Sequence, residues 1–298
     1  MTATKMFCPK EHELRYGKMV TPHKRLEALR PVEAFFLEVM EDYPTVPTYD
    51  CNFNEAHYFW TMNYTNLSDC FYMHPLQFDL MHQQMTDALI HGSDDGYDFK
   101  THYGERILKD QSNKYNDIKS KTDYKAEVLV VLPGTNIYDK TVSLAKLRMI
   151  VENYGKHAII KPHPLTNKDH LEDIKKSLLP SARILDPKDD LYHYMQKVDL
   201  VFTTHSSESA LNAVCLDKVI QPVDKYQARH SGSFSALSRL LFSAIEPEPI
   251  INRIFNDYRS GLIHPEIHKD WQDRIVQYLD YIHIVREHFK TAYMKDPK

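Results

Sequence analysis

The sequence predicts an α/β protein whose residues 126–223 form a doubly wound parallel sheet. Short apolar runs alternate there with segments of helical spacing, and polar clusters follow directly on several of the apolar runs. This alternation is typical of parallel strands joined by right-handed crossovers. The run Val128–Leu132 is continuously apolar, as expected for a strand that is buried on both faces.

Five strands and four helices are expected in this region. The apolar runs predict strands at 128–132, 158–160, 182–185, 199–203 and 219–220. Apolar residues at helical spacing predict helices at 142–151, 169–178, 191–198 and 207–214. Together these elements predict a Rossmann-like domain over residues 125–245.

The 298 residues are enough for two lobes with a cleft between them. Residues 106–125 are polar and rich in lysine, which favours a linker and places the boundary near Tyr124. The predicted parts are therefore a smaller N-terminal lobe over 1–124, the Rossmann-like domain, and C-terminal helices over 246–298 that pack back on the body. Outside the Rossmann-like domain, helices are expected at 22–40, 76–89 and 271–289, and short extended segments at 57–64 and 69–73.

Composition excludes several classes of protein. Hydrophobic residues make up 42% and charged residues 26%, which suits a globular chain, and a net charge of −4 gives no general field for nucleic acid. No apolar run reaches the roughly 20 residues of a membrane span, and the first residues lack the apolar core of a signal peptide. The chain is therefore expected in the cytoplasm, with its four cysteines reduced.

The sequence gives little support for a bound metal. It has no CxxC or DxD motif. In its HxxxH pair, His264 and His268 are separated by a segment that contains Pro265, which disfavours a helix that presents both rings. Neither a metal nor another cofactor is expected.

The segment Lys161-Pro162-His163-Pro164 directly follows a predicted strand. Loops at the carboxyl ends of parallel strands line the binding crevice of a doubly wound sheet. Two prolines stiffen this loop, so the ammonium and imidazole point in fixed directions that suit phosphate oxygens. The alternative is a rigid turn with a histidine in solvent.

The segment from Thr203 to Leu211 follows another predicted strand and is rich in hydroxyls. Its polar residues stand just before a predicted helix, where free backbone N–H groups and the helix dipole attract anions. Ordinary helix capping explains the same composition. The residues expected to contact a ligand here are Thr204, His205, Ser206, Ser207 and Glu208, the last through a sugar hydroxyl.

Two further clusters are weaker candidates. Gly134 and Thr135 follow the first strand of the domain, where the glycine would let the backbone approach a ligand. Asp94-Asp95-Gly96 offers paired carboxylates, in which repulsion and partial burial would raise one pKa toward that of a general base. A simple turn is the alternative for this triplet.

The order of these three motifs, Asp94-Asp95-Gly96, Lys161-Pro162-His163-Pro164 and Ser206-Ser207-Glu208, resembles bacterial sialyltransferases and related capsule or Kdo transferases of the GT-B fold. The resemblance covers residues 92–224. It implies a metal-independent glycosyltransferase with a nucleotide-sugar donor. It also implies that Asp95 is the base with Asp94 beside it, and that His163, Ser206 and Ser207 contact the donor phosphate.

Other functions stay open at this stage. The acceptor is a glycan or, as in phage glucosyltransferases of similar fold, a hydroxylated DNA base. The lysines that would face DNA are Lys109, Lys114, Lys119, Lys121 and Lys125. A polyol-phosphate transferase or an epimerase would share the phosphate loops, and a binding module would keep the crevice without the base.

Overall fold

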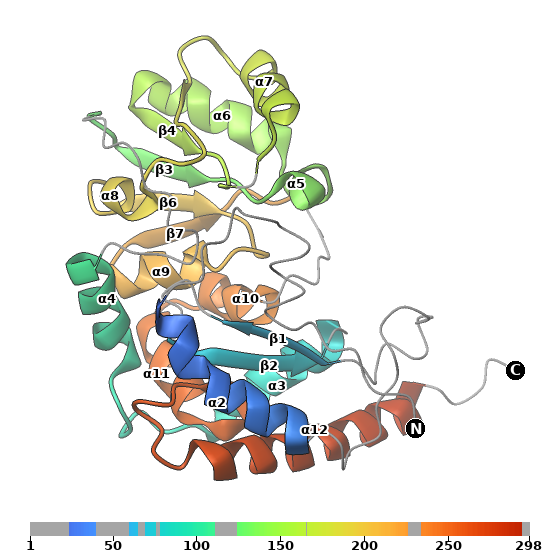
Figure 1. The fold of residues 1–298 in the computed structure, drawn as a ribbon. Coiled ribbons are helices and arrows are strands. Elements are labelled where there is room, and N and C mark those ends of the chain that lie inside the picture. The colour runs from blue at the N-terminus through green and yellow to red at the C-terminus, as the bar shows by residue number, and fades with distance from the viewer. Residues whose placement is uncertain are drawn as a thin grey trace, which may run out of the picture. The chain divides into compact units, whose positions relative to one another are not determined.

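The computed structural model describes residues 24–39, 60–64, 69–75, 78–110, 124–164, 166–225 and 234–293. The chain divides into two compact units, drawn in Figure 1. Unit 1 combines Met1–Phe99 with Pro249–Lys298, and unit 2 is Lys100–Glu248. The C-terminal helices therefore belong with the N-terminal part of the chain, and the division falls at residue 100 rather than near Tyr124.

The division falls earlier than Tyr124 because of helix α4 (Phe99–Asp110), which was not predicted from the sequence. A Cβ added to Gly104 would lie 2.4 Å from the carbonyl oxygen of Cys215, so the glycine lets α4 pack closely on helix α9 (Ser209–Cys215). Lys100 also forms an ion pair with Asp217. A polar helix with such contacts is part of unit 2, whereas residues 111–123 of the expected linker lie outside the described part.

Unit 2 contains the predicted parallel sheet, which is confirmed. Its five strands are all parallel and lie in the order β5-β4-β3-β6-β7, and Figure 1 shows β4, β3, β6 and β7 side by side. The strands are β3 (Val128–Val131), β4 (Ala158–Lys161), β5 (Arg183–Ile184), β6 (Leu200–Thr203) and β7 (Val219–Pro222). The remaining helices of the unit are α5 (Thr135–Thr141), α6 (Leu144–Tyr154), η5 (Gly155–His157), α7 (Lys168–Ser177), α8 (Leu191–Met195) and α10 (Ser235–Ser243).

Burial of the sheet explains why its strands could be predicted. Every residue of β3 and of β4 is buried, so each strand is apolar along most of its length. Val128 and Val130 share one core with Leu147 of α6 and Ile174 of α7. The chain leaves β3 toward β4 and β5 and later returns to β6 and β7, so the strand order reverses between β3 and β6. Ligands of doubly wound sheets bind at this reversal, outside the carboxyl ends of the strands.

Unit 1 contains a three-stranded antiparallel sheet in the order β1-β2-β8. The strands are β1 (Trp60–Tyr64), β2 (Phe71–Pro75) and β8 (Leu262–Ile263). Its helices are α2 (Lys24–Val39), α3 (Phe78–His91), α11 (Glu248–Asn256), η6 (Tyr258–Ser260) and α12 (Trp271–Tyr293). The first residue of α11, Glu248, is the last residue of unit 2. This sheet is not a second Rossmann-like half, because all of its pairings are antiparallel.

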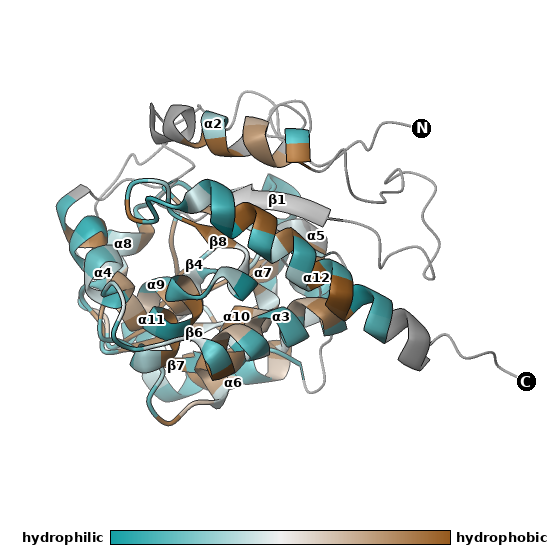
Figure 2. Ribbon diagram, turned by 90° about the horizontal axis from the view of Figure 1, so that it is seen from below, coloured by the Kyte–Doolittle hydropathy of each residue, from teal (hydrophilic) through white to brown (hydrophobic). Residues whose placement is uncertain are grey.

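The core of unit 1 joins helices from both ends of the chain. Leu29, Val32 and Phe36 of α2 share a buried cluster with Ile275 and Leu279 of α12. In Figure 2 the ribbon of α12 carries alternating brown and teal bands, as expected for a helix with one apolar face. The helices predicted at 22–40, 76–89 and 271–289 correspond to α2, α3 and α12. Among the described residues, no helix has both the length and the apolar character needed to cross a membrane.

Candidate functional site

The candidate site of unit 2 lies along the carboxyl edge of its parallel sheet. Strands β4, β3 and β6 are neighbours, so the loops that follow them lie on one edge. Two strand spacings of about 4.8 Å separate β4 from β6, which places the loops containing His163 and Ser206 about 10 Å apart. The topology therefore brings the predicted histidine and serine motifs to the same side of the sheet.

Lys161 supports this edge from inside, where its ammonium is bonded to two backbone carbonyls. Its side chain is buried, and Nζ donates to the carbonyl oxygens of Pro162 at 2.8 Å and Pro187 at 2.7 Å. Burial lowers the pKa of Lys161 to about 8, against the opposing effect of nearby carboxylates led by Asp189. The sequence reading placed this ammonium on the donor. The structure instead uses it to tie the end of β4 to the loop after β5.

The loops after β3 and β4 are joined by one hydrogen bond. The backbone N–H of Asn167 donates to Oγ1 of Thr135 at 3.3 Å. Gly134 stands at the N-cap of α5 with φ −61°, a conformation that any residue can adopt. Any benefit of glycine here would therefore come from the missing side chain, which lets a ligand approach the backbone. Beyond the same loop, His163 and Pro164 are half-buried, and the carbonyl of His163 accepts from the N–H of Thr166 at 2.9 Å.

The loop after β6 is held together by its own hydroxyl groups. Thr204 Oγ1 and Ser206 Oγ are 2.9 Å apart. Ser207 Oγ donates to Ser209 Oγ at 2.9 Å and accepts from the backbone N–H of Ser209 at 3.1 Å. Helix α9 therefore begins at Ser209, two residues later than predicted, with the buried Glu208 at its N-cap position.

Several buried polar atoms around this loop could still form hydrogen bonds. Thr203 Oγ1, Asn212 Nδ2 and Ser235 Oγ are buried, and each lacks a hydrogen-bond partner among the described residues. They come from β6, α9 and α10 respectively. Buried polar atoms in proteins are normally paired with protein, water or ligand. The end of β6 is thus more polar than its own packing requires.

A segment in which the sequence analysis predicted no site residue crosses this edge. After β7, Val223 N–H donates to Thr203 O at 2.9 Å, Ser143 N–H donates to Val223 O at 2.9 Å, and Lys225 N–H donates to Thr141 O at 2.7 Å. These bonds carry residues 223–225 from the end of β7 past β6 to the junction of α5 and α6. Asp224 is held in the middle of this segment.

His205 is bound to Asp224 through two of its nitrogens. Its backbone N–H donates to Asp224 Oδ2 at 2.9 Å, and its ring Nδ1 lies 2.7 Å from the same oxygen. The imidazole also packs against Phe242 of α10, with ring centroids 4.7 Å apart. Asp224 is buried, whereas the side chain of His205 is 24% exposed. No local motif marks Asp224, because only the crossing segment brings it to the β6 loop.

The Asp94-Asp95-Gly96 triplet lies in unit 1 and forms an exposed turn. Asp94 makes a two-point ion pair with Arg253 of α11, at 2.8 Å to Nε and 2.6 Å to Nη2. The hydrogen bond from Arg253 holds the pKa of Asp94 below its usual value. One pKa of the carboxylate pair was expected to be raised, and Asp94 is therefore not that carboxyl. Asp95 is exposed beside it, and its backbone N–H donates to Ser93 Oγ at 3.0 Å.

The same turn is docked on α11 by amide side chains. Asn256 accepts from Tyr97 N–H at 2.9 Å and donates to Tyr97 O at 2.8 Å, and Asn252 donates to Asp98 at 3.1 Å. A Cβ on Gly96 would lie 2.3 Å from the side chain of Asn256. The glycine is thus needed for close docking on α11.

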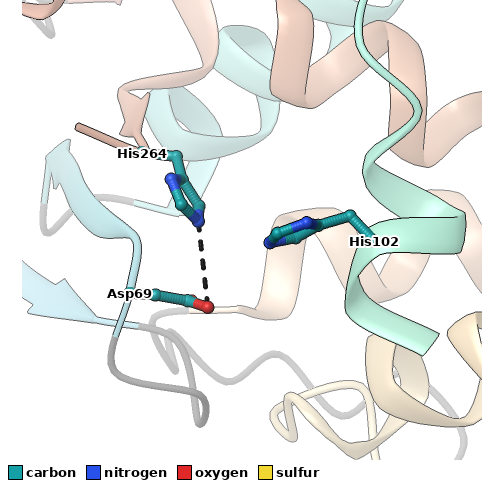
Figure 3. A group of neighbouring side chains, drawn as sticks. All are labelled: Asp69, His102 and His264. Atoms are coloured by element: carbon teal, nitrogen blue, oxygen red, sulfur yellow. Dashed lines mark ion pairs between the residues drawn. The ribbon is translucent and has the colours of Figure 1, made fainter. Parts of the chain in front are cut away.

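The His264 and His268 pair forms a buried turn between β8 and α12. His268 Nδ1 accepts from the backbone N–H of His264 at 3.1 Å. Burial lowers the pKa of His268 to about 3, so this ring is neutral and can accept that bond. His264 Nε2 lies 3.8 Å from Asp69 Oδ2. Figure 3 marks this ion pair with a dashed line. These contacts lie within unit 1 and connect β8 to the segment before β2.

Two of the five lysines considered for DNA contact lie within the described residues. Lys109 and Lys125 are exposed, and Lys114, Lys119 and Lys121 lie outside the described residues. Lys109 belongs to the last turn of α4 rather than to a linker. The proposed stripe therefore stays a sequence-based hypothesis.

No protein-family model and no curated protein match the chain. Among solved structures, the chain is similar to "Thermosulfurimonas dismutans KpsC, beta Kdo 2,4 transferase", with 13% identity, a TM-score of 0.37, and coverage of 59% of this chain and 70% of that chain. It is also similar to "Thermosulfurimonas dismutans KpsC, beta Kdo 2,7 transferase", with 13% identity, a TM-score of 0.35, and coverage of 65% and 76%. Both are Kdo transferases, one of the groups whose motif order the sequence resembles. TM-scores this low do not establish a shared fold, so the function rests on the chain's own residues.

Proposed function

We propose that this protein is a glycosyltransferase that moves a sugar from a nucleotide-sugar donor to an acceptor hydroxyl. One observation carries the proposal: the histidine and serine loops follow β4 and β6, on either side of β3, at the edge where doubly wound sheets bind nucleotides. No metal and no cofactor other than the donor is required. A GT-B-like architecture of two lobes is part of the proposal, with unit 1 as the lobe on the acceptor side even though its sheet is antiparallel.

Each loop has a place in this reaction. His163, Ser206 and Ser207 hold the donor phosphate in this proposal, since imidazole and hydroxyl groups donate hydrogen bonds to phosphate oxygens. To donate to a phosphate, the Ser207 hydroxyl has to turn away from Ser209 Oγ, to which it donates in the structure. Glu208 accepts from a ribose or sugar hydroxyl. The side-chain atoms of Thr203, Asn212 and Ser235 that lack a partner among the described residues support a polar ligand at the end of β6, because burying such groups without partners is costly.

The acceptor base in this proposal is Asp95 rather than Asp94. A base must reach its substrate with a lone pair that is not already engaged. Asp94 is occupied by Arg253 through both carboxylate oxygens, whereas Asp95 is exposed in the same turn. The acceptor is a glycan, with a hydroxylated DNA base as the second candidate.

The first test is thermal unfolding in the presence of cytidine, uridine, guanosine and adenosine mono- and diphosphates. A ligand at about 100 times its dissociation constant stabilises the folded state by roughly 2.7 kcal/mol. One nucleotide should raise the melting temperature of the wild type, and His163→Ala should remove that gain. His157→Ala is the matched control, because His157 precedes β4 at the opposite edge of the same sheet. A wild type that responds to no nucleotide would refute the proposal.

Product analysis then separates the related functions. Incubation with the stabilising nucleotide's sugar donor should release free nucleotide in proportion to glycosylated acceptor. Transfer of an intact polyol phosphate or interconversion of the donor sugar would instead show a polyol-phosphate transferase or an epimerase. A binding module would keep its full function after Asp95→Ala.

A further inference from the structure

Asp224 and His205 form a pair that the three sequence motifs do not account for. The carboxylate is on the segment after β7, and the imidazole is in the loop after β6. They lie at the edge where the donor phosphate is proposed to bind. We propose that Asp224 is a positioning residue that fixes His205, so that the ring's Nε2–H donates to the oxygen of the departing phosphate. This inference rests on the proposed glycosyltransferase function.

The carboxylate is held rigidly enough to orient a ring. Its segment is pinned on both sides, by Val223 to β6 and by Lys225 to the end of α5. Asp224 Oδ2 accepts from both the backbone N–H and the ring Nδ1 of His205. These two bonds fix the loop and the imidazole relative to one carboxylate, and Phe242 restrains the ring further. A preorganised donor has little reorganisation left to undergo during reaction.

The hydrogen bond also decides which ring nitrogen meets a ligand. A carboxylate accepts only, so Nδ1 must carry the hydrogen in this contact. Nε2 is then the nitrogen available to a substrate. When Nε2 is also protonated, the ring is positively charged, and the carboxylate stabilises that charge. Thr204 and Ser206 stand on either side of His205 in the chain, and their hydroxyl oxygens lie 2.9 Å apart.

In the proposed transfer, the acceptor oxygen forms a bond to the anomeric carbon while the bond from that carbon to the donor phosphate oxygen breaks. The electron pair of the broken bond stays on the phosphate oxygen, and the acceptor proton passes to the base. The charged Nε2–H of His205 donates a hydrogen bond to this oxygen and keeps its proton. Donors placed where charge develops accelerate the chemical step more than they strengthen binding.

Steady-state turnover of the full chain with the stabilising nucleotide's sugar donor tests the pair. Asp224→Asn should lower kcat by about ten- to a hundredfold, as does loss of the carboxylate that orients a metal-bound histidine. KM for the donor should stay nearly unchanged. Glu127→Gln is the matched control, because Glu127 pairs with His157 at 3.9 Å on the amino edge of the same sheet. That control should keep wild-type turnover.

Two further measurements separate positioning from support of the fold. His205→Gln should lower kcat, and adding Asp224→Asn to it should cost little more, because the carboxylate acts through the ring. In the nucleotide complex, 15N NMR should show the hydrogen-bonded Nδ1–H of His205 in the wild type, and Asp224→Asn should change this signal. Additive losses would overturn the inference. Wild-type turnover in His205→Gln would overturn it even if Asp224→Asn does not fold. Nucleotide stabilisation of the wild type, measured separately, distinguishes this failure from failure of the proposed function.

Discussion

His74 should make unit 1 unstable in mild acid. Its side chain is buried in β2, where Nδ1 lies 2.8 Å from Pro75 O. The imidazole also packs on the ring of Tyr72, with ring centroids 4.6 Å apart. Burial lowers the pKa of His74 from 6.5 to about 4, and the bond to Pro75 opposes this only in part. The folded chain therefore takes up the proton at a lower pH than the unfolded chain does. As pH falls from 6.5 toward 4, protonation of His74 favours the unfolded state.

The size of the effect follows from the two pKa values. A drop from 6.5 to about 4 corresponds to about 3 kcal/mol when fully expressed, at about 1.4 kcal/mol for each tenfold change. At about pH 5, a histidine with these values costs about 2 kcal/mol relative to about pH 7.5. Above about pH 7.5 the residue has almost no effect, since it is neutral in both states.

Urea unfolding followed by tryptophan fluorescence measures this loss. Both tryptophans, Trp60 and Trp271, belong to unit 1, so the signal reports on the unit that contains His74. His74→Phe keeps the aromatic contact but cannot titrate, and it should lose about 2 kcal/mol less than the wild type between about pH 7.5 and 5. His91→Asn, at an exposed position of α3, is the control and should match the wild type. An unchanged pH dependence in His74→Phe would refute the reasoning.

Three other predictions follow from close contacts and from the acidic turn. Gly104→Ala should destabilise unit 2 by about 1 to 3 kcal/mol, measured by thermal unfolding followed by circular dichroism. The added methyl would lie 2.4 Å from Cys215 O, and this clash outweighs the preference of helices for alanine. A stabilised variant would show that α4 does not pack there. Gly261→Ala should unfold unit 1 more severely, because φ is +70° and the methyl would lie 2.1 Å from a backbone oxygen, and a wild-type melting temperature would contradict this. Asp95→Ala should abolish turnover and keep nucleotide stabilisation, whereas Asp94→Ala should retain measurable turnover; equal losses would argue against Asp95 as the base.

The sequence by itself determined the parallel sheet of unit 2 and the position of its polar loops. Residues 128–131 and 158–160 are apolar because both faces of these strands are buried, a signal that lies within a few adjacent residues. The polar groups of His163 and Ser206 follow directly on strands, so the rule for the carboxyl edge could place them. Their topological neighbourhood was therefore predictable without coordinates.

Other elements lacked a local signal. Strand β8 has only two residues, too few for a periodic pattern, and it becomes a strand by pairing with β2. Helix α4 is polar on most of its surface, and its burial depends on the close approach of Gly104 to α9. Both elements are stabilised by tertiary contacts more than by their own sequence.

The tertiary structure alone decided how the candidate residues are engaged. Arg253 is 159 residues from Asp94, and Asp224 is 19 residues from His205, so no spacing rule connects either pair. The same holds for Lys161, whose ammonium was predicted to contact a phosphate. In the structure it donates to Pro187 O, 26 residues away. Short apolar patterns encode strands because burial acts on neighbouring residues. Hydrogen bonds and ion pairs between distant residues exist only once the chain has folded, and these bonds decide which side chains are left for chemistry.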